Sequence, residues 1–495
     1  MPLAGIRHSV AVNADPTMIL AGALLLCGAL LSKTSSRFGV PSLLLFLFLG
    51  MVAGSEGLLG IEFDDFEVAS RVGVIALAFI LFSGGFSTRW SDVRPVLGLG
   101  VTLASVGVML SAGVLGVTAA FVLGFDLQYG LLLGAIIAST DAAAVFSILR
   151  SKGLGLQGRL RPLLELESGS NDPAAVFLTV AVITVVTGEG SGLAGLAGSF
   201  VVQMALGAAA GWILGRIAVW VINEVRLDYD GLYPPMTIAF VILVFEGVTW
   251  LGGSGFLAAY VAGLVFANRE LLHKRSLSHF FDAIAWLMQI TMFVLLGLLV
   301  FPSDLGAVVV DGVVVAALLT FVARPVAVFV TGLPFRLPWR HLAMTSWVGL
   351  RGATPVILAT LPVVEGIDGA DRIFDIVFFV VLISVAVQGS TIPIVARWLG
   401  VAETDRGRRG YWIEAALEGD SGHDLHELVV PGDSPADGVA ILGLHFPEDS
   451  LIVLIQRGDE VVVPQGRTEL FAGDRLLVMA DEETLPQVRG IIGLH

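Results

Sequence analysis

The sequence predicts an all-α polytopic membrane protein of about thirteen membrane-spanning helices, followed by a small α+β domain. About two-thirds of the 495 residues are apolar when glycine is included and only 14% are charged, whereas an average soluble protein has about 45–50% and about 25%. Residues 403–495 differ from the rest, because they hold eighteen acids and seven bases and no long apolar run. This composition excludes disordered, collagen-like and nucleic-acid-binding chains, so no nucleic-acid partner is expected.

Apolar stretches of roughly the 17–25 residues that cross a bilayer recur through residues 17–400. The first is predicted to be a membrane helix and not a cleaved signal, because no small-residue cleavage site follows it before Lys33. Residues 1–16 precede the membrane part, and residues 401–424 are predicted to link it to a domain at 425–495. The thirteen predicted spans are 17–32, 38–54, 68–88, 96–123, 128–149, 161–187, 193–222, 234–251, 254–268, 279–301, 306–332, 341–363 and 371–398.

Alternate connections between these spans differ in charge, which predicts the orientation. The basic set lies near residues 33–37, 89–94, 150–161, 216–226, 269–275, 336–340 and 397–409. The acidic set lies near residues 56–67, 126, 189, 304–311 and 365–371. Since basic connections stay in the cytoplasm, we expect a multi-pass protein of the cell (inner) membrane, in contact with its lipid. Its N-terminus would lie outside and its acidic C-terminal domain in the cytoplasm.

Polar residues inside the spans are candidates for function, because an ionised residue at a helix centre costs about 2.5–3.5 kcal/mol on insertion scales. Asp141 lies near the middle of the span at 128–149 and follows two hydroxyl residues, Ser139 and Thr140. Such hydroxyls bond to nearby backbone and loosen a helix. The alternative is that Asp141 is a solvated acid of a loop.

The span at 161–187 holds a second polar group, which comprises Glu167, Ser168, Asn171, Asp172 and Pro173. Ser168 and Asp172 are four residues apart and therefore share a helix face. Pro173 cannot donate to the Gly169 carbonyl, so that oxygen is left without its helical partner. Carboxylate, hydroxyl and amide oxygens are hard ligands that suit a small alkali cation. The alternative is that Asn171-Asp172-Pro173 is only a turn.

The span at 341–363 contains Arg351 within Gly349-Leu350-Arg351-Gly352-Ala353. A buried arginine is expected to find an acid, and the glycines around it indicate a broken helix that lines a cavity. If this span and the span at 128–149 both break, they are seven spans apart. That is the relation expected of two inverted repeats whose broken helices cross at the membrane centre. Glu246, in the span at 234–251, has no assigned role.

Three motifs resemble the signatures of NhaP-type monovalent cation:proton antiporters, in the order that family has: Thr140-Asp141, Glu167-Ser168-x-x-Asn171-Asp172 and Gly349-Leu350-Arg351-Gly352-Ala353. The resemblance covers residues 17–400. It implies a thirteen-helix fold and a homodimer in which a core moves against a dimerisation domain. It also implies that Asp172 binds the cation and the proton, assisted by Asp141, Ser168 and the Thr140 backbone, with Glu167 and Arg351 as a structural ion pair.

The same resemblance implies electroneutral exchange, which goes with an Asn-Asp pair such as Asn171-Asp172. One departure is Ser83, where many relatives are expected to carry an acid. The physical mechanism needs no ATP motif or cofactor, and no G-x-x-x-x-G-K-[ST] is present. A cation and a proton that compete for one carboxylate become coupled if only the occupied core can change sides.

The sequence pattern of the C-terminal residues is typical of short β-strands separated by turns. Residues 451–455 and 461–463 are predicted strands joined by a turn at 457–460, 475–480 is another strand, and 482–490 is a closing helix. Ser434 is predicted to begin a further helix. Residues 425–495 resemble the TrkA-C module through Gly473-Asp474-x-Leu476-x-Val478 and Val462-x-Pro464-x-Gly466. The resemblance implies a regulatory domain that takes a small ligand such as a nucleotide; the alternative is a dimer cap without a ligand.

The sequence therefore favours an antiporter that exchanges potassium, or else sodium, for protons in pH and cation homeostasis. Potassium is preferred only because TrkA-C modules accompany potassium channels and transporters. One alternative is a regulated potassium channel or transporter subunit without proton coupling, but a T-V-G-Y-G filter is absent. Another is an intramembrane protease, which Gly252-Gly253-Ser254-Gly255 suggests. Its histidine is missing from the later spans, because His273, His279 and His341 lie at predicted cytoplasmic ends.

Overall fold

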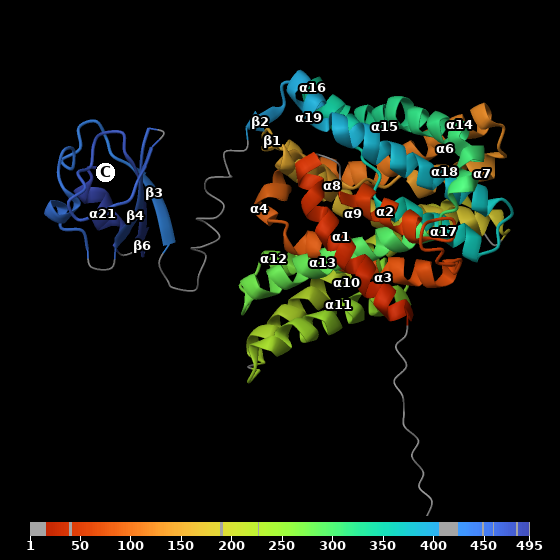
Figure 1. The fold of residues 1–495 in the computed structure, drawn as a ribbon, viewed down its shortest axis with the longest axis horizontal. Coiled ribbons are helices and arrows are strands. Elements are labelled where there is room, and N and C mark those ends of the chain that lie inside the picture. Colours follow the sequence, from red (N-terminus) through yellow and green to blue (C-terminus); the bar gives the residue numbers. More distant parts are fainter. Residues whose placement is uncertain are drawn as a thin grey trace, which may run out of the picture. The chain divides into compact units, whose positions relative to one another are not determined.

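The computed structural model describes residues 16–38, 42–188, 192–225, 227–404, 424–447, 450–458, 460–481 and 484–494. The chain divides into two compact units, Met1–Thr404 and Asp405–His495. The first is helical, and the second contains a sheet (Figure 1). The predicted N-terminal segment and linker lie almost wholly outside the described residues.

Each of the thirteen predicted spans corresponds to apolar helix in the first unit. Among the described residues, eight helices are long and apolar enough to cross a membrane: α3 (Phe66–Phe86), Trp90–Leu123, α9 (Leu160–Val186), most of α10 (Leu193–Glu224), Asp230–Trp250 with α11 (Tyr233–Trp250), α13 (Lys274–Leu298), Pro302–Phe335 and Ala370–Trp398. Shorter apolar helices occupy the remaining five spans: α1 (Pro16–Phe38), α2 (Ser42–Ala53), α7 (Leu127–Ile137), α12 (Gly255–Ala267) and α17 (Ala353–Val364). The protein is therefore a multi-pass membrane protein.

Two spans are interrupted, as predicted. The fifth consists of α7 and α8 (Ala142–Ser151), with non-helical residues between them. The twelfth consists of α16 (Trp339–Trp347) and α17, again with a non-helical segment between. The two breaks meet, because the Asp141 N–H donates a hydrogen bond of 2.8 Å to the Leu350 carbonyl. A backbone N–H that has no helical partner in one break thus bonds to a backbone carbonyl that has none in the other. Such pairing makes non-helical chain possible inside a membrane protein.

Another pair of spans seven apart shares a wide π turn, which usually marks a local distortion near function. The fourth contains α4 (Trp90–Val93), η1 (Arg94–Val96), α5 (Leu97–Thr102), the π turn η2 (Leu103–Gly107) and α6 (Val108–Leu123). The eleventh contains α14 (Pro302–Leu318), the π turn η4 (Leu319–Ala323), α15 (Arg324–Gly332) and η5 (Leu333–Phe335). The thirteenth contains α18 (Ala370–Ile383), the π turn η6 (Ser384–Gln388) and α19 (Gly389–Trp398). The match between the fourth and eleventh spans supports inverted repeats, although repeat symmetry itself stays a prediction.

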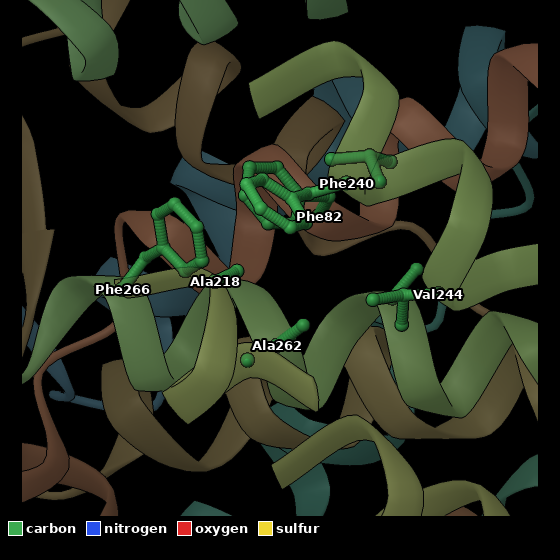
Figure 2. A pocket seen from close by; sticks show the side chains of 9 residues that line it. Phe82, Ala218, Phe240, Val244, Ala262 and Phe266 are labelled. Atoms are coloured by element: carbon green, nitrogen blue, oxygen red, sulfur yellow. The ribbon is translucent and has the colours of Figure 1, made fainter. Parts of the chain in front are cut away.

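Helices α3, α10, α11 and α12 pack around an apolar pocket. Figure 2 shows Phe82, Phe240 and Phe266 among the side chains that line it, together with Ala218. The rings of Phe82 and Phe266 meet edge-on, with centroids 5.2 Å apart. Gly263 allows α12 to touch α3, because a Cβ there would overlap the Phe82 carbonyl oxygen. In a bilayer, where apolar helices gain no hydrophobic energy by meeting, such close backbone contact is a principal source of packing.

A small sheet that the sequence did not predict ties two distant connections together. β1 (Leu154–Leu156), between α8 and α9, pairs antiparallel with β2 (Ala402–Thr404), which follows α19. The Gln157 N–H extends the contact with a 3.0 Å hydrogen bond to the Val401 carbonyl. The segment before α9 is therefore joined to the chain that leaves the helical unit.

The second unit is an antiparallel sheet with one closing helix. Its strands are β3 (Asp424–Val429), β4 (Leu451–Arg457), β5 (Glu460–Val462) and β6 (Arg475–Ala480), in the order β3-β6-β4-β5. The helix α21 (Leu485–Ile491) closes the chain, and a 3-10 turn, η8 (Ile441–Leu444), lies between β3 and β4. Strand alternation buries Leu476, Val478 and Ala480 against Val488 and Ile492 of the helix end. The predicted strands and the closing helix are thus confirmed in type.

The predicted helix at Ser434 is wrong, because this region is a series of turns. Pro431 and Pro435 flank Ser434, and Gly438 has a positive φ of 74°, so no regular helix continues through the segment. The Ser434 hydroxyl donates 2.6 Å to the Ile492 carbonyl and accepts 3.1 Å from the Ala436 N–H. The residue therefore fastens this loop to the end of α21.

Asp474 is expected to be a main polar contributor to the stability of this unit. It accepts hydrogen bonds from the Arg457 Nε (2.9 Å) and Nη2 (2.8 Å) and from the Phe471 N–H (2.9 Å). Burial alone would raise the pKa of Asp474, but these bonds and the charge of Arg457 outweigh it and hold the pKa below its ordinary 3.8. The stabilisation is therefore complete above that ordinary pKa and is lost as the pH falls through the lowered one.

Asp474→Asn should lower the free energy of unfolding of residues 405–495 by about 1.5–3 kcal/mol at pH 7, the usual size for bonds to charged groups. Urea unfolding followed by circular dichroism measures it, and the gap to the wild type should shrink in acid. Asp433, an exposed acid on a nearby turn, gives the matched control Asp433→Asn, which should cost almost nothing. Equal losses from the two variants would contradict the role given to Asp474.

Candidate functional site

The polar residues of the sixth span lie on one continuous buried helix. Glu167, Asn171 and Asp172 of α9 are 1%, 0% and 7% exposed. The helix passes through Pro173, so the alternative of a simple turn at Asn171-Asp172-Pro173 is excluded. Since Pro173 has no N–H, the Gly169 carbonyl loses its helical donor one turn before. The chain thus holds a carboxylate and an amide inside the protein with locally loosened backbone.

The break between α7 and α8 is held against this helix by two side chains from one of its faces. The Asn171 Nδ2 donates 2.6 Å to the Thr140 Oγ1. The Ser168 hydroxyl donates 2.9 Å to the Thr140 carbonyl and accepts 3.0 Å from the Ala142 N–H. The structure therefore brings Thr140 into contact with Ser168 and Asn171, which follow it by about thirty residues in the sequence. The Ser168 hydroxyl bonds to backbone groups on both sides of Asp141.

Asp141 and Asp172 form the acidic centre of this crossing. Their charges lie close enough to interact, and the side chains of Thr354 and Ser139 lie beside Asp172. The Asp141 Oδ1 accepts 3.1 Å from the Ala144 N–H, so Asp141 caps the start of α8, where the helix dipole favours an anion. No cluster of three histidine, cysteine or acidic side chains occurs among the described residues. The arrangement offers two carboxylates amid neutral oxygens, a low-charge set of hard ligands.

Gly352 is expected to be required for this geometry. A Cβ at this position would overlap both the Cβ and the carboxylate of Asp141. Gly352→Ala should therefore displace Asp141 and slow transport by about tenfold or more, as sub-ångström to 1 Å misplacements do at reacting sites. The measurement is initial exchange rate in liposomes, with Gly113→Ala as control, since nothing lies within 4 Å of a Cβ at Gly113. Wild-type rates in Gly352→Ala would refute the contact.

Arg351 donates hydrogen bonds to backbone carbonyls through one of its guanidinium nitrogens. It is fully buried, and its Nη1 donates to the Ala138 carbonyl (2.7 Å) and to that of Ser139. Its own N–H donates 3.0 Å to the Ser384 hydroxyl at the π turn η6. A guanidinium at the carbonyl end of α7 compensates both the unpaired carbonyls and the negative end of the helix dipole. Arg351 thereby links the two broken spans.

The direct ion pair of Glu167 is with Arg324, whose Nη1 lies 2.6 Å from the Glu167 Oε1. The predicted partner Arg351 makes no direct ion pair with Glu167 among the described residues, but the charges of the two side chains lie close enough to interact. The Arg324 side chain is 3% exposed and its Nη2 also donates 3.3 Å to the Thr345 carbonyl near the end of α16. The physical reason is that the carbonyls of the α7 break compensate Arg351, whereas Glu167 needs a charged partner that the neighbouring span supplies.

Sequence reasoning missed Arg324 and also Thr354, Ser139 and Asp282 as neighbours of the candidate residues. A signal for Arg324 existed, since it is the one basic residue in the predicted span 306–332 and lies thirteen residues beyond Asp311, the acid near the start of that span; such a residue needs a partner. The same signal was present for Asp282, which is the one acid in the predicted span 279–301. It comes from α13, and its Oδ1 accepts 3.4 Å from the hydroxyl of Ser83, the position where an acid was expected.

Comparisons with known proteins agree with this architecture. Residues 22–398 match the family model described as sodium/hydrogen exchanger, transmembrane, and residues 425–493 match the TrkA-C domain. The chain is 38% identical to the K(+)/H(+) antiporter NhaP2 of Shewanella baltica, over 96% of this chain and 82% of the relative. It is 36% identical to the K(+)/H(+) antiporter NhaP of Alkalimonas amylolytica, over 96% and 83%.

Two further relatives extend the comparison. The Na(+)/H(+) antiporter NhaH of Halobacillus aidingensis is 30% identical over 73% of this chain and 93% of its own length. The solved structure of the sodium proton antiporter MjNhaP1 from Methanocaldococcus jannaschii at pH 8 has the same fold, with a TM-score of 0.67 and 24% identity over 76% of this chain and all of that one. With a family model that matches most of its length and a close relative that matches nearly all of it, this chain belongs to the sodium/hydrogen exchanger family, whose members are cation:proton antiporters and not enzymes.

Proposed function

We propose that the protein exchanges potassium for protons one for one, with Asp172 as the site that the two ions share. The observation that carries the proposal is the burial of Asp172 where the two broken spans cross, beside Asp141 and neutral hydroxyls. A potassium ion bound at Asp172, Asp141 and Ser168, near Thr140 and Asn171, excludes a proton from Asp172, and a proton excludes the ion. Beyond these transported ions, the mechanism requires no cofactor.

The one-for-one stoichiometry follows from the charge that the moving core carries. Asp172 is neutralised either by a proton or by a potassium ion, so the occupied site has the same net charge in both directions. Asn171, which contacts Thr140, does not titrate and adds no second charge. The complete transport cycle therefore moves no net charge across the membrane. The membrane potential, worth about 2.3 kcal/mol per charge per 100 mV, does not drive the cycle, and exchange is electroneutral.

Potassium is the first choice because two relatives that match 96% of this chain are named for it and because the chain carries a TrkA-C domain. Sodium is the second candidate, since NhaH is named for sodium. The basic and acidic connections support an N-terminus outside and a C-terminal domain in the cytoplasm of the inner membrane. We include in the proposal a homodimer embedded in lipid, and a small regulatory ligand such as a nucleotide at residues 425–495.

The test uses purified protein in liposomes that hold a pH dye and a preformed pH gradient. Potassium should dissipate the gradient at lower concentration than sodium or lithium, and an imposed membrane potential should leave the rate unchanged. If none of the three cations dissipates the gradient, exchange is refuted; if the rate follows the potential, electroneutrality is refuted. Deletion of residues 405–495 should alter the pH or ligand response but retain exchange, and cross-linking in the membrane should report the dimer.

A further inference from the structure

A cavity of about 420 Å³ lies between α9, α10, α11 and α12. Most of its lining is apolar, but five of its side chains carry neutral polar groups and one is acidic. The polar set is Thr184, Ser199, Gln203, Thr249, Ser254 and Glu246. A cavity this large holds several waters, so it can carry a hydrated ion that a fully apolar pocket would reject.

One end of the cavity lies against the helix that carries the candidate site. Pro173 and Val176 of α9 line it, although Asp172 itself does not. Pro173 follows Asp172 directly, and Val176 lies one turn beyond Asp172 on the same helix face. The cavity then continues along α9 to Thr184, two residues before that helix ends at Val186. It therefore extends along α9 from the residue after Asp172 towards the acidic, predicted outer side of the membrane.

Glu246 is the ionisable residue of this lining, and the described residues give it no contact that would stabilise the fold. It is exposed, and among the described residues it makes no hydrogen bond and no ion pair. It lies four residues before the end of α11 at Trp250, about 6 Å along the helix axis. An unpaired acid at this depth costs insertion energy and by default indicates function.

We propose that Glu246 collects the monovalent cation in this cavity and so serves the outward-facing half of the transport cycle. A carboxylate in a cleft with low-dielectric walls concentrates ions of the opposite sign. The hydroxyl of Thr249 and the amide of Gln203 line the same cavity and supply neutral oxygens beside it. This role rests on the proposed exchange at Asp172, because it describes how the cation reaches that residue from one side.

The first test is the sidedness of the apparent KM for potassium in oriented vesicles. Glu246→Gln should raise the KM for potassium added outside by about threefold to tenfold, leave the KM from the cytoplasmic side unchanged, and leave the maximal rate largely intact. Glu246→Asp should recover most of the affinity. The matched control is Glu365→Gln, an exposed acid of the same predicted side that does not line the cavity. Equal changes from the two sides, no change, or an equal effect of the control would overturn the proposal.

A second test does not depend on transport, so it separates failure of this proposal from failure of the proposed function. In a Cys27→Ser background, which removes the single native cysteine, Ser199→Cys places a thiol in the cavity wall. A membrane-impermeant cationic thiol reagent added outside should label it several times faster with Glu246 than with Glu246→Gln, and an anionic reagent should show the opposite order. Equal rates with both reagents, or labelling only from the cytoplasmic side, would refute the proposal.

Discussion

Asp172→Asn is expected to reduce cation:proton exchange to the level of protein-free liposomes. The substitution keeps the size of the side chain but removes the charge and the proton site together, so neither ion has its binding group. Asp172 is 7% exposed, so the substitution removes the charged group from a buried position. The measurement is dissipation of a pH gradient by potassium and by sodium.

The controls for this experiment separate loss of function from loss of structure. The variant should elute as the wild type does in detergent and should keep its helical circular dichroism, because an amide is easier to bury than a carboxylate. Asp141→Asn retains Asp172 and should weaken cation affinity without abolishing exchange. Robust exchange by a correctly folded Asp172→Asn protein would remove this residue from the mechanism.

The second large effect is expected at Arg324. Arg324→Met removes the direct ion-pair partner of Glu167, a carboxylate whose side chain is 1% exposed. Removing one member of a buried pair typically costs about 3–5 kcal/mol, so the thermal unfolding temperature and the yield of monodisperse protein should fall sharply. Arg324→Lys keeps the charge and should be milder, although it loses the bond to the Thr345 carbonyl.

A double-mutant cycle distinguishes the pair in the structure from the pair expected from the sequence. Glu167→Gln should restore much of the stability lost in Arg324→Met, because no charge is then left unpaired. It should not restore stability lost in Arg351→Met, since Arg351 holds the carbonyls of Ala138 and Ser139. Rescue of Arg351→Met and not of Arg324→Met would reinstate the pair between Glu167 and Arg351.

Much of the fold could be predicted because a bilayer restricts the secondary structure and the length of the segments that cross it. Apolar length located the spans, and the hydroxyls before Asp141 and the glycines around Arg351 located the two breaks. Pattern alone did not reveal the sheet formed by Leu154–Leu156 and Ala402–Thr404, because each strand has three residues. Such short pieces acquire strand structure only from pairing across a long loop.

The candidate residues could be selected from the sequence, but the contacts between their side chains could not. Spacing on one helix placed Ser168 and Asp172 together, whereas the choice between Arg324 and Arg351 for Glu167 depends on how three spans pack. Sequence patterns indicate which residues are costly to bury. They do not indicate which residue of a neighbouring helix will be the partner. The prediction of a helix start at Ser434 was wrong for a related reason. The Ser434 hydroxyl bonds to the carbonyl of Ile492, fifty-eight residues away, and does not cap a local helix.

The two-stranded clamp between β1 and β2 has a mechanical consequence. The chain that continues beyond Thr404 towards the TrkA-C domain is fastened first to the segment between α8 and α9. α8 begins at the break that Asp141 caps, and α9 carries Asp172. A displacement of Thr404 would therefore act, through three pairs of residues, on the connection between the two helices that carry Asp141 and Asp172 of the candidate site. It would act equally on α19, which directly precedes β2.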